Sequence, residues 1–197
     1  MAKLNFVYST MNSGKTLDLL RTVHNYEENG YKVLVMKPNI DTKGGNKIVT
    51  RLGLERVVDF LIDRDTNILE LLKGKLTDIK SIFIDEAQFL RKEQVDDLFL
   101  ITKIYNIDVI CYGLRLDFRM EAFEGSERLL AISEELRELK TMCRCGKTAR
   151  YVGRRVNRKF VTDGELVVID GTKNIEYVPL CGDCYLKDVK QIDGKEE

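Results

Sequence analysis

Residues 9–16 read Ser9-Thr10-Met11-Asn12-Ser13-Gly14-Lys15-Thr16, directly after a strand-like apolar run at residues 3–9. Apolar side chains then recur at helical spacing, which places this octapeptide between a strand and a helix. Its last residues match the phosphate-loop pattern, with serine at position 9 where the pattern has glycine. In such a loop, backbone N–H groups at the helix N-terminus bind nucleotide phosphates, the lysine adds a positive charge, and the threonine hydroxyl can bind Mg²⁺. The alternative is an ordinary helix start that Ser13 caps.

A second strand-like run, residues 81–84, ends in two carboxylates, Asp85 and Glu86. In a sheet that carries a phosphate loop, an acidic residue at the C-terminal end of a strand lies in the ligand crevice. Asp85 is therefore expected to help hold Mg²⁺. Side chains alternate along an extended chain, so Glu86 points differently and is placed to take a proton from the phosphate acceptor. The alternative is that both acids cap a helix expected near Arg91 or are solvated in a loop.

The pattern of residues 1–141 predicts a parallel sheet. Apolar runs at 31–36, 79–84 and 107–112 are continuous rather than alternating, as in strands buried on both faces, and helical patterns separate the runs. One amphipathic helix is expected around residues 95–102 and another over 126–140, where Leu129, Ile132, Leu136 and Leu139 share a face. We therefore expect an α/β fold of the P-loop NTPase (RecA-like) type, with helices on both faces of the sheet.

Four cysteines occur in two pairs, Cys143-Arg-Cys145 and Cys181-Gly-Asp-Cys184. Four thiolates from two short turns suit a tetrahedral, structural Zn²⁺ with no open position for catalysis. Disulfides are the alternative, but they need an oxidising compartment, and the N-terminal sequence has no secretion signal. A block this small needs such a staple to be stable. We expect an ATP-binding α/β domain at 1–141 and a zinc-ribbon-like lobe at 142–197, with short strands at 149–156, 165–169 and 176–180.

The charge balance restricts the class of protein. Lys plus Arg and Asp plus Glu both number 32 in 197 residues, so the formal net charge is zero, which argues against a dedicated nucleic-acid binder. The sequence has no apolar run near 18 residues, so we expect no membrane span. Without a secretion signal, the expected location is the cytoplasm. Too little chain remains for the second ATPase domain of a helicase, and a kinase that acts on a small acceptor fits better.

Three other features are assigned no catalytic role. Cys111 lies in an apolar run and is expected to be a buried small hydrophobe. His24 is the single histidine and falls within the first expected helix, where a structural or exposed position is expected. The basic run from Arg150 to Arg158 can contact anions or form a solvated strand face, and the sequence leaves both open.

Several motifs together resemble one family. Residues 9–16, Asp85-Glu-Ala-Gln-Phe89, Cys111-Tyr-Gly-Leu-Arg-Leu-Asp-Phe-Arg119 and the two cysteine pairs are similar, in this order, to the cellular-type (type II) thymidine kinases of the bacterial branch. The resemblance covers essentially the whole chain. It implies that ATP and thymidine react with Mg²⁺ to give dTMP and ADP, in pyrimidine deoxynucleotide salvage for DNA synthesis. It further implies a cytoplasmic homotetramer that dTTP inhibits.

The resemblance also implies the roles of individual residues. Glu86 is similar to the general base that accepts the proton of the nucleoside 5′-hydroxyl, and residues 9–16 with Asp85 and Gln88 would bind ATP and its metal. Residues that match the nucleoside-binding positions are Met11, Leu114 and Phe118 around the base, the loop Val167-Val168-Ile169-Asp170-Gly171, and Tyr177.

Some questions stay open at this point. Arg51, Arg115 and Arg119 are all candidates to stabilise the transferring phosphate. If backbone groups read the edge of the base, deoxyuridine should be a poorer but usable acceptor, and deoxycytidine should be nearly excluded. The rival readings are a nucleotide-dependent nucleic-acid-binding module and a kinase for another deoxynucleoside or a mononucleotide.

Overall fold

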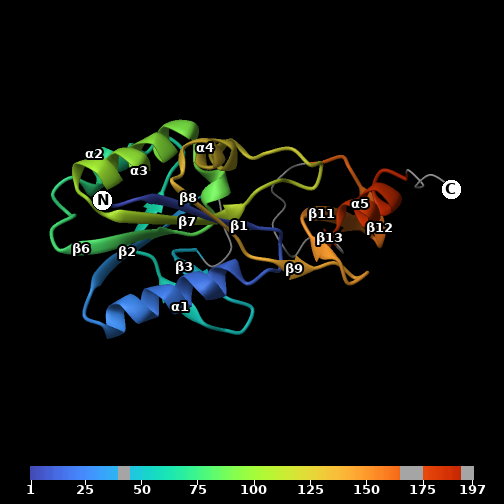
Figure 1. Ribbon diagram of the computed structural model, residues 1–197, viewed down its shortest axis with the longest axis horizontal. Helices are drawn as coiled ribbons and strands as arrows, with labels where there is room; N and C mark the ends of the chain where they lie inside the picture. The colour runs from blue at the N-terminus through green and yellow to red at the C-terminus, as the bar shows by residue number, and fades with distance from the viewer. Residues whose placement is uncertain (40–44, 165–174, 192–197) are drawn as a thin grey trace.

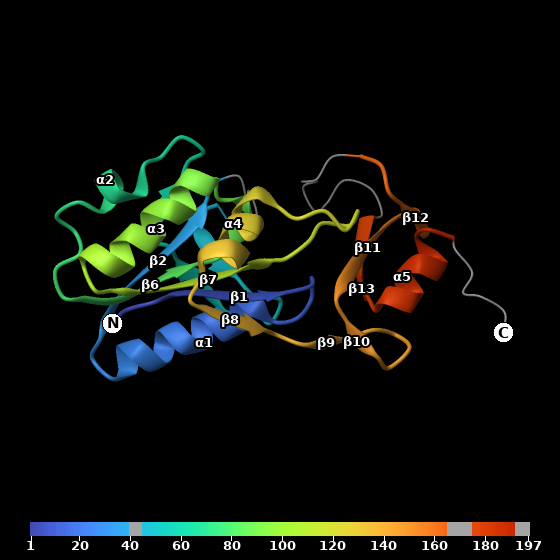
Figure 2. The same cartoon turned by 45° about the horizontal axis from the view of Figure 1, so that its top comes forward.

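The computed structural model describes residues 1–39, 45–164 and 175–191 (Figure 1). The longer part of the chain forms a layered α/β structure, and a smaller lobe lies at one end of it (Figures 1 and 2). The elements in chain order are β1 Leu4–Ser9, α1 Lys15–Glu28, β2 Lys32–Pro38, β3 Lys47–Val49, β4 Glu55–Val57, β5 Phe60–Ile62, α2 Ile68–Leu72, β6 Ile79–Ile84, a 3₁₀ turn Ala87–Phe89, α3 Lys92–Ile104, β7 Asp108–Leu114, α4 Glu124–Ile132, β8 Glu135–Glu138, β9 Thr141–Met142, β10 Thr148–Ala149, β11 Tyr151–Val156, β12 Lys159–Val161, β13 Ile175–Leu180 and α5 Gly182–Asp188.

A six-stranded sheet in the order β5-β2-β6-β7-β1-β8 is the centre of the larger part. Each neighbouring pair in it is parallel. Helix α1 covers one face, and α2, α3 and α4 cover the other (Figure 2). The predicted α/β class with helices on both faces is therefore confirmed, and parallel strands covered in this way account for the continuous apolar runs.

Alternation along the strands explains the two faces. In β1, Phe6 packs into the cluster on the α2–α3–α4 face, whereas its neighbour Val7 packs into the cluster beside α1. On the α1 face, Leu19 and Val23 of the helix meet Val35 of β2. Each of these side chains is buried, so both faces gain stability from apolar area removed from water.

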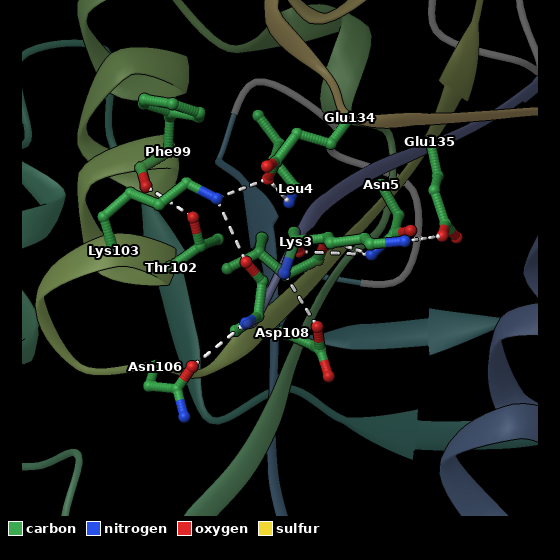
Figure 3. Close-up of polar contacts among 12 residues, drawn as sticks. Lys3, Leu4, Asn5, Phe99, Thr102, Lys103, Asn106, Asp108, Glu134 and Glu135 are labelled. Carbon is green, nitrogen blue, oxygen red and sulfur yellow. Dashed lines mark hydrogen bonds and ion pairs between the residues drawn. The ribbon is translucent and has the colours of Figure 1, made fainter.

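The helix expected over 126–140 is wrong in its second half. Helix α4 ends at Ile132, and β8 (135–138) then pairs parallel with Asn5–Tyr8 of β1. Figure 3 shows what holds the start of β8: the Glu134 carboxylate accepts hydrogen bonds from the Leu4 amide at 3.2 Å and from Lys103 Nζ at 2.6 Å. The next residue after Glu134, Glu135, forms an ion pair with Lys3. Residues 135–138 thus pair with the open edge of β1 although the leucine spacing would suit a helix, because the pairing satisfies the backbone N–H and C=O groups of β1.

The lobe is built from short strands and one helix. Strands β9 and β10 form one hairpin, and β12, β11 and β13 form an antiparallel sheet against which α5 packs. The expected strands at 149–156 and 176–180 are confirmed, whereas the one at 165–169 lies outside the described residues. The lobe touches the larger part where Tyr185 Oη donates a hydrogen bond to the Phe118 carbonyl at 2.7 Å. The domain boundary at 141/142 stays a prediction.

None of the helices in the described part of the chain is both long enough and apolar enough to cross a membrane.

Candidate active site

The shape of the loop between β1 and α1 depends on a glycine and on the hydrogen bonds of two serines. Gly14 has φ 84°, a left-handed conformation that favours glycine, and α1 begins at the next residue. The helix start has no side-chain cap, which excludes the reading in which Ser13 is merely an N-cap. Instead, Ser13 Oγ donates to the Thr10 carbonyl at 3.1 Å and contacts Ser9 Oγ. The serine at position 9 is therefore part of the hydrogen bonding that shapes the loop.

Lys15 is buried inside this loop. Its Nζ donates to the Thr10 carbonyl at 2.9 Å and to Ser9 Oγ at 3.3 Å. Burial lowers the pKa of Lys15, and the nearby carboxylates of Glu86 and Asp85 oppose that shift only in part. An anion placed in the loop would give the ammonium a further opposite charge and raise its pKa again, so this position favours a bound polyphosphate.

Asp85 and Glu86 follow β6 at the same edge of the sheet. Asp85 is buried, and its backbone N–H donates to the Met36 carbonyl at 3.0 Å. Glu86 has φ 52°, which is uncommon for a residue with a side chain. It precedes the 3₁₀ turn without capping it through its side chain. Helix α3 begins later, after Arg91, whose backbone N–H donates a hydrogen bond to Gln94 Oε1 at 3.0 Å. The capping alternative for the two acids is therefore excluded.

A cavity of about 280 Å³ brings these groups together. The loop residues that line it are Met11, Asn12, Ser13, Gly14, Lys15 and Thr16, and Asp85, Glu86 and Leu114 face them. Ser9, Thr10 and Gln88 are buried and are not among the lining residues of the described chain. The cavity lies at the C-terminal ends of β1, β6 and β7, where α/β sheets bind ligands.

The cavity contains oxygen donors suited to Mg²⁺. The Thr16 hydroxyl and the Asp85 carboxylate belong to residues that line the same space. Both are hard oxygen ligands of the kind that Mg²⁺ prefers beside nucleotide phosphates.

The four paired cysteines form a second cluster, in the lobe. The Sγ atoms of Cys143, Cys145, Cys181 and Cys184 all lie within 4.8 Å of one another, and all four thiols are free. A tetrahedral site with Zn–S bonds of about 2.3 Å requires sulfur atoms about 3.8 Å apart, which this cluster matches. Burial would raise the pKa of Cys143, but hydrogen bonds from the Cys145 and Cys181 backbones outweigh it and lower the pKa to about 7. The cluster is thus able to hold a structural metal ion.

Comparison with known proteins agrees with this geometry. The sequence profile described as thymidine kinase matches residues 2–185. A thymidine kinase of Mannheimia succiniciproducens is 44% identical over 185 residues, covering 92% of this chain and 93% of that protein. A thymidine kinase of Streptococcus gordonii is 41% identical over 189 residues, covering 95% and 97%. A thymidine kinase of Enterobacteria phage T4 is 46% identical over 157 residues, covering 78% and 81%.

The chain belongs to the thymidine kinase family. The resemblance inferred from the motifs is confirmed, and relatives of bacterial origin are among those that match over most of their length. In structure, a Bacteroides Pif1 bound to single-stranded DNA aligns with a TM-score of 0.35 and 17% identity, covering 66% of this chain and 32% of that chain, a similarity too low to inform fold or function.

The predicted nucleoside-binding residues of the kinase lie in different places. Met11 and Leu114 line the cavity. Phe118 is buried outside it, with the guanidinium of Arg154 4.9 Å from its ring centroid. Tyr177 lies on β13, and its carbonyl accepts a hydrogen bond from Asn12 Nδ2 at 3.3 Å, which joins the lobe to the phosphate loop. Residues 167–171 lie outside the described residues.

The three arginines that are candidates to stabilise the transferring phosphate lie in different places. Arg51 lines the cavity. Arg115 donates to the Arg150 carbonyl at 3.5 Å, and Arg119 forms a 3.0 Å ion pair with Asp117. In the described residues, Arg51 is therefore the one of the three that faces the phosphate loop.

Sequence reasoning missed one wall of the cavity of the kinase. Residues 47–52, from β3 and the turn after it, line the cavity opposite the phosphate loop, and of these only Arg51 was singled out. Lys37 of β2 is fully buried, and its Nζ donates to the Lys47 carbonyl at 3.0 Å, which ties this wall to the sheet. A lysine inside an apolar strand is the signal that could have pointed to it, because a buried charge needs partners.

Cys111 and His24 occupy the expected places, whereas the basic run 150–158 is not a uniformly solvated strand face, because Arg154 is buried. Cys111 is fully buried, and burial raises the pKa of its thiol. His24 is exposed and lies 3.3 Å from Glu28 on the surface of α1. In the basic run, Arg154 is buried against Phe118, whereas Arg150 is 3.5 Å from Glu138 at the surface.

Proposed function

We propose that this kinase transfers the γ-phosphate of ATP to the 5′-hydroxyl of thymidine, giving dTMP and ADP. One observation supports the proposal most directly: the phosphate loop, Asp85 and Glu86 line one cavity together with Leu114. This arrangement supports a phosphate site, a carboxylate base and an apolar contact for the nucleoside next to one another. The family supplies the identity of the acceptor.

The phosphates are bound by the loop amides of residues 9–16 and by the Lys15 ammonium. When charge moves onto the β,γ-bridging oxygen, these groups stabilise it without having to reorganise. Mg²⁺ held by Thr16 and Asp85 would add charge neutralisation at the same phosphates. We assign contact with the transferring group to Arg51, because it lines the opposite wall of the cavity.

Glu86 serves as the general base. Its carboxylate accepts the proton of the 5′-hydroxyl as that oxygen forms a bond to the γ-phosphorus. The bond between the γ-phosphorus and the bridging oxygen breaks, and ADP leaves with the electron pair. The reaction consumes no other reactant.

Specificity for the base rests on Met11, Leu114 and Phe118, with Tyr177 and residues 167–171 from the lobe. If backbone groups of that segment read the polar edge of thymine, cytosine leaves them mispaired, which costs more than the loss of the thymine methyl group, for which about 1–3 kcal/mol is typical. Deoxyuridine is then a poorer acceptor, and deoxycytidine is nearly excluded.

The family resemblance extends the proposal beyond the site. We infer a cytoplasmic homotetramer that takes part in pyrimidine deoxynucleotide salvage, is inhibited by dTTP and carries one structural Zn²⁺ per chain. The zinc ion holds the ends of the insert 146–180 together, and the lobe closes over the nucleoside and excludes water.

The decisive experiment measures ADP release from Mg-ATP with thymidine, deoxyuridine, deoxycytidine, deoxyguanosine or single-stranded DNA offered separately. We expect release with thymidine, dTMP formed in equal amount, a lower kcat/KM for deoxyuridine and almost no release with deoxycytidine. Similar kcat/KM values for thymidine and deoxycytidine would overturn the account of the base pocket. Release that depends only on DNA would reject the acceptor and favour a nucleic-acid-dependent ATPase.

A further inference from the structure

Both ends of one buried amide side chain are engaged beside the proposed base. Gln88, in the 3₁₀ turn after β6, is 2% exposed. Its Nε2 donates to the Glu86 carboxylate, and its Oε1 accepts the Leu114 backbone N–H at 3.0 Å. The two contacts place Gln88 between the acid that would take the proton and the end of β7, which carries Leu114 at the cavity wall.

The orientation of the amide is fixed by chemistry. A backbone N–H can only donate, so the end of Gln88 that faces Leu114 must be the oxygen. The NH₂ group is therefore left for the Glu86 carboxylate, which can only accept when ionised. The neutral NH₂ group of Gln88 orients the Glu86 carboxylate without giving it a proton or pairing it with a full positive charge. The carboxylate therefore stays able to take a proton from the hydroxyl group that receives the phosphate.

Glycines lie where β7 and α4 approach the turn that carries Gln88. A Cβ at Gly113 of β7 would lie 2.9 Å from Gln88 Oε1 and 3.1 Å from the Gln88 backbone nitrogen. A Cβ at Gly125 of α4 would lie 2.6 Å from the Ala87 carbonyl oxygen and 2.7 Å from that of Leu90. Helix α4 thus approaches the turn where a side chain at residue 125 would collide with backbone, and a side chain at residue 113 would displace the end of Gln88 from β7.

Glu86 needs such support because its own backbone is unusual. Its φ of 52° places it in the left-handed region, and its side chain begins outside regular structure. A residue in that conformation persists only where its neighbours determine it. The amide of Gln88, itself tied to β7, gives the carboxylate one fixed contact at the edge of the cavity.

We propose that Gln88 is a positioning residue that holds the Glu86 carboxylate toward the acceptor hydroxyl, and that it is not a ligand of the ATP phosphates. The inference rests on the proposed role of Glu86. It differs from the role that the family resemblance implies for Gln88, because both ends of the amide are occupied within the protein and Gln88 does not line the cavity among the described residues.

The test is a double-mutant cycle on the full chain with Mg-ATP and thymidine. Gln88→Met keeps the approximate length of the side chain but can neither donate to Glu86 nor accept from Leu114. We expect kcat to fall by about 10- to 100-fold, the size of loss that a misplaced reacting group causes, while the Kd of ATP measured by calorimetry changes less than about twofold. The decisive variant is Glu86→Gln with Gln88→Met, whose kcat should equal that of Glu86→Gln alone, because Gln88 acts only through Glu86.

A second variant separates the two contacts of Gln88. Gln88→Glu keeps an oxygen for the Leu114 amide and so preserves the link to β7, but it places a second carboxyl group against Glu86. Two buried carboxyl groups in contact cannot both ionise, so they share one proton and Glu86 is no longer held as a free carboxylate by a neutral amide. We expect a folded protein with a loss in kcat at least as large as that of Gln88→Met. Wild-type kcat in Gln88→Glu would overturn the inference.

Other outcomes also overturn it. A Kd of ATP weakened about tenfold or more in Gln88→Met, with kcat unchanged, would make Gln88 a phosphate ligand. A double variant with fully additive losses would show that Gln88 acts independently of Glu86. If the wild-type protein forms dTMP and the cycle is additive, only this inference fails, whereas a wild-type protein that forms no dTMP rejects the proposed function itself.

Discussion

The six-stranded domain and the cysteine lobe are stabilised in different ways. The sheet has a cluster of buried apolar side chains on each face. One cluster draws on α2, α3 and α4 and the other on α1, and both include several strands. The buried cluster of the lobe has few members, Cys143, Ala149, Leu180, Cys181, Tyr185 and Val189, of which two are themselves candidate metal ligands. Apolar burial alone can stabilise the first region, whereas we expect the second to depend on a metal ion held by its four cysteines. If the lobe does need its metal ion, residues 9–16 fold with the sheet alone, whereas the nucleoside contacts that we propose for the lobe form only when the metal is bound.

Loss of the metal site should have the largest effect and should be confined to the lobe. In Cys181→Ser we expect bound zinc to fall from one per chain to none, hydrogen-exchange protection to be lost over 141–164 and 175–191, and activity to disappear, because metal-binding free energy is folding free energy. Amides of β1, β6 and β7 should stay protected.

The matched control is Cys111→Ala, which removes a buried thiol outside the cluster and should leave the zinc content unchanged. A metal-free Cys181→Ser protein with full activity and a protected lobe would contradict the comparison.

A core mutation in the larger domain should lower stability without loss of zinc. Leu98 of α3 is fully buried on one face of the sheet, so Leu98→Ala should lower the free energy of unfolding by about 2–5 kcal/mol while zinc remains bound. Leu100→Ala on the same helix is the control, because Leu100 is 42% exposed and its loss should change stability by about 0.5 kcal/mol or less. Denaturant unfolding and metal analysis check both, and equal effects of the two variants would reject the assignment of the core.

The junction between the regions gives a smaller effect. Tyr185→Phe removes the 2.7 Å hydrogen bond to the Phe118 carbonyl and leaves a buried acceptor without that donor, which should cost about 1–3 kcal/mol. We also expect the KM for thymidine to rise more than the KM for ATP, since Phe118 is on the nucleoside side of the proposed site. Tyr151→Phe, in the ring packed 5.8 Å from Tyr185, is the control. A KM change confined to ATP would contradict this role of the junction.

The smallest effect depends on pH and concerns Asp18 of α1, whose carboxylate accepts a hydrogen bond from Arg137 of the edge strand β8. Burial would raise the pKa of Asp18, but hydrogen bonds from Arg21, Arg137 and Tyr112 outweigh it, so the folded-state pKa lies below the ordinary 3.8. A carboxyl with a lowered pKa stabilises the fold above its ordinary value and loses this contribution as the pH falls through the folded-state value. Asp18→Asn should therefore cost about 1 kcal/mol or less at pH 7, with the difference shrinking below pH 3.8. A difference that grows in acid would contradict the sign.

The features that the sequence predicted well are local ones. The strand, loop and helix from Lys3 to Val23 follow from residues adjacent in sequence, and so do the carboxylates after β6 and the cysteine pairs. Their chemistry is readable because each motif carries its own turn residues, charges or ligands.

The features that it missed depend on contacts between distant segments. The leucine spacing of 129–139 fits a helix, but the free edge of β1, more than a hundred residues away, converts its second half into β8. The contact of Gln88 with Leu114 depends on Gly113, whose missing Cβ has meaning only once β7 lies beside the turn. The wall at 47–52 consists of β3 and the turn after it, and its place is set by packing of Ile48 beside α1.

The central claim is that Glu86, at the wall of the phosphate cavity, takes the proton of the thymidine hydroxyl. The most direct measurement compares dTMP formation and ATP binding in the wild-type protein and in Glu86→Gln, which keeps the size of the side chain and removes the base. We predict that kcat falls by about 10²- to 10⁴-fold while the Kd of ATP is nearly unchanged and zinc stays bound. An unchanged kcat would remove Glu86 from the mechanism.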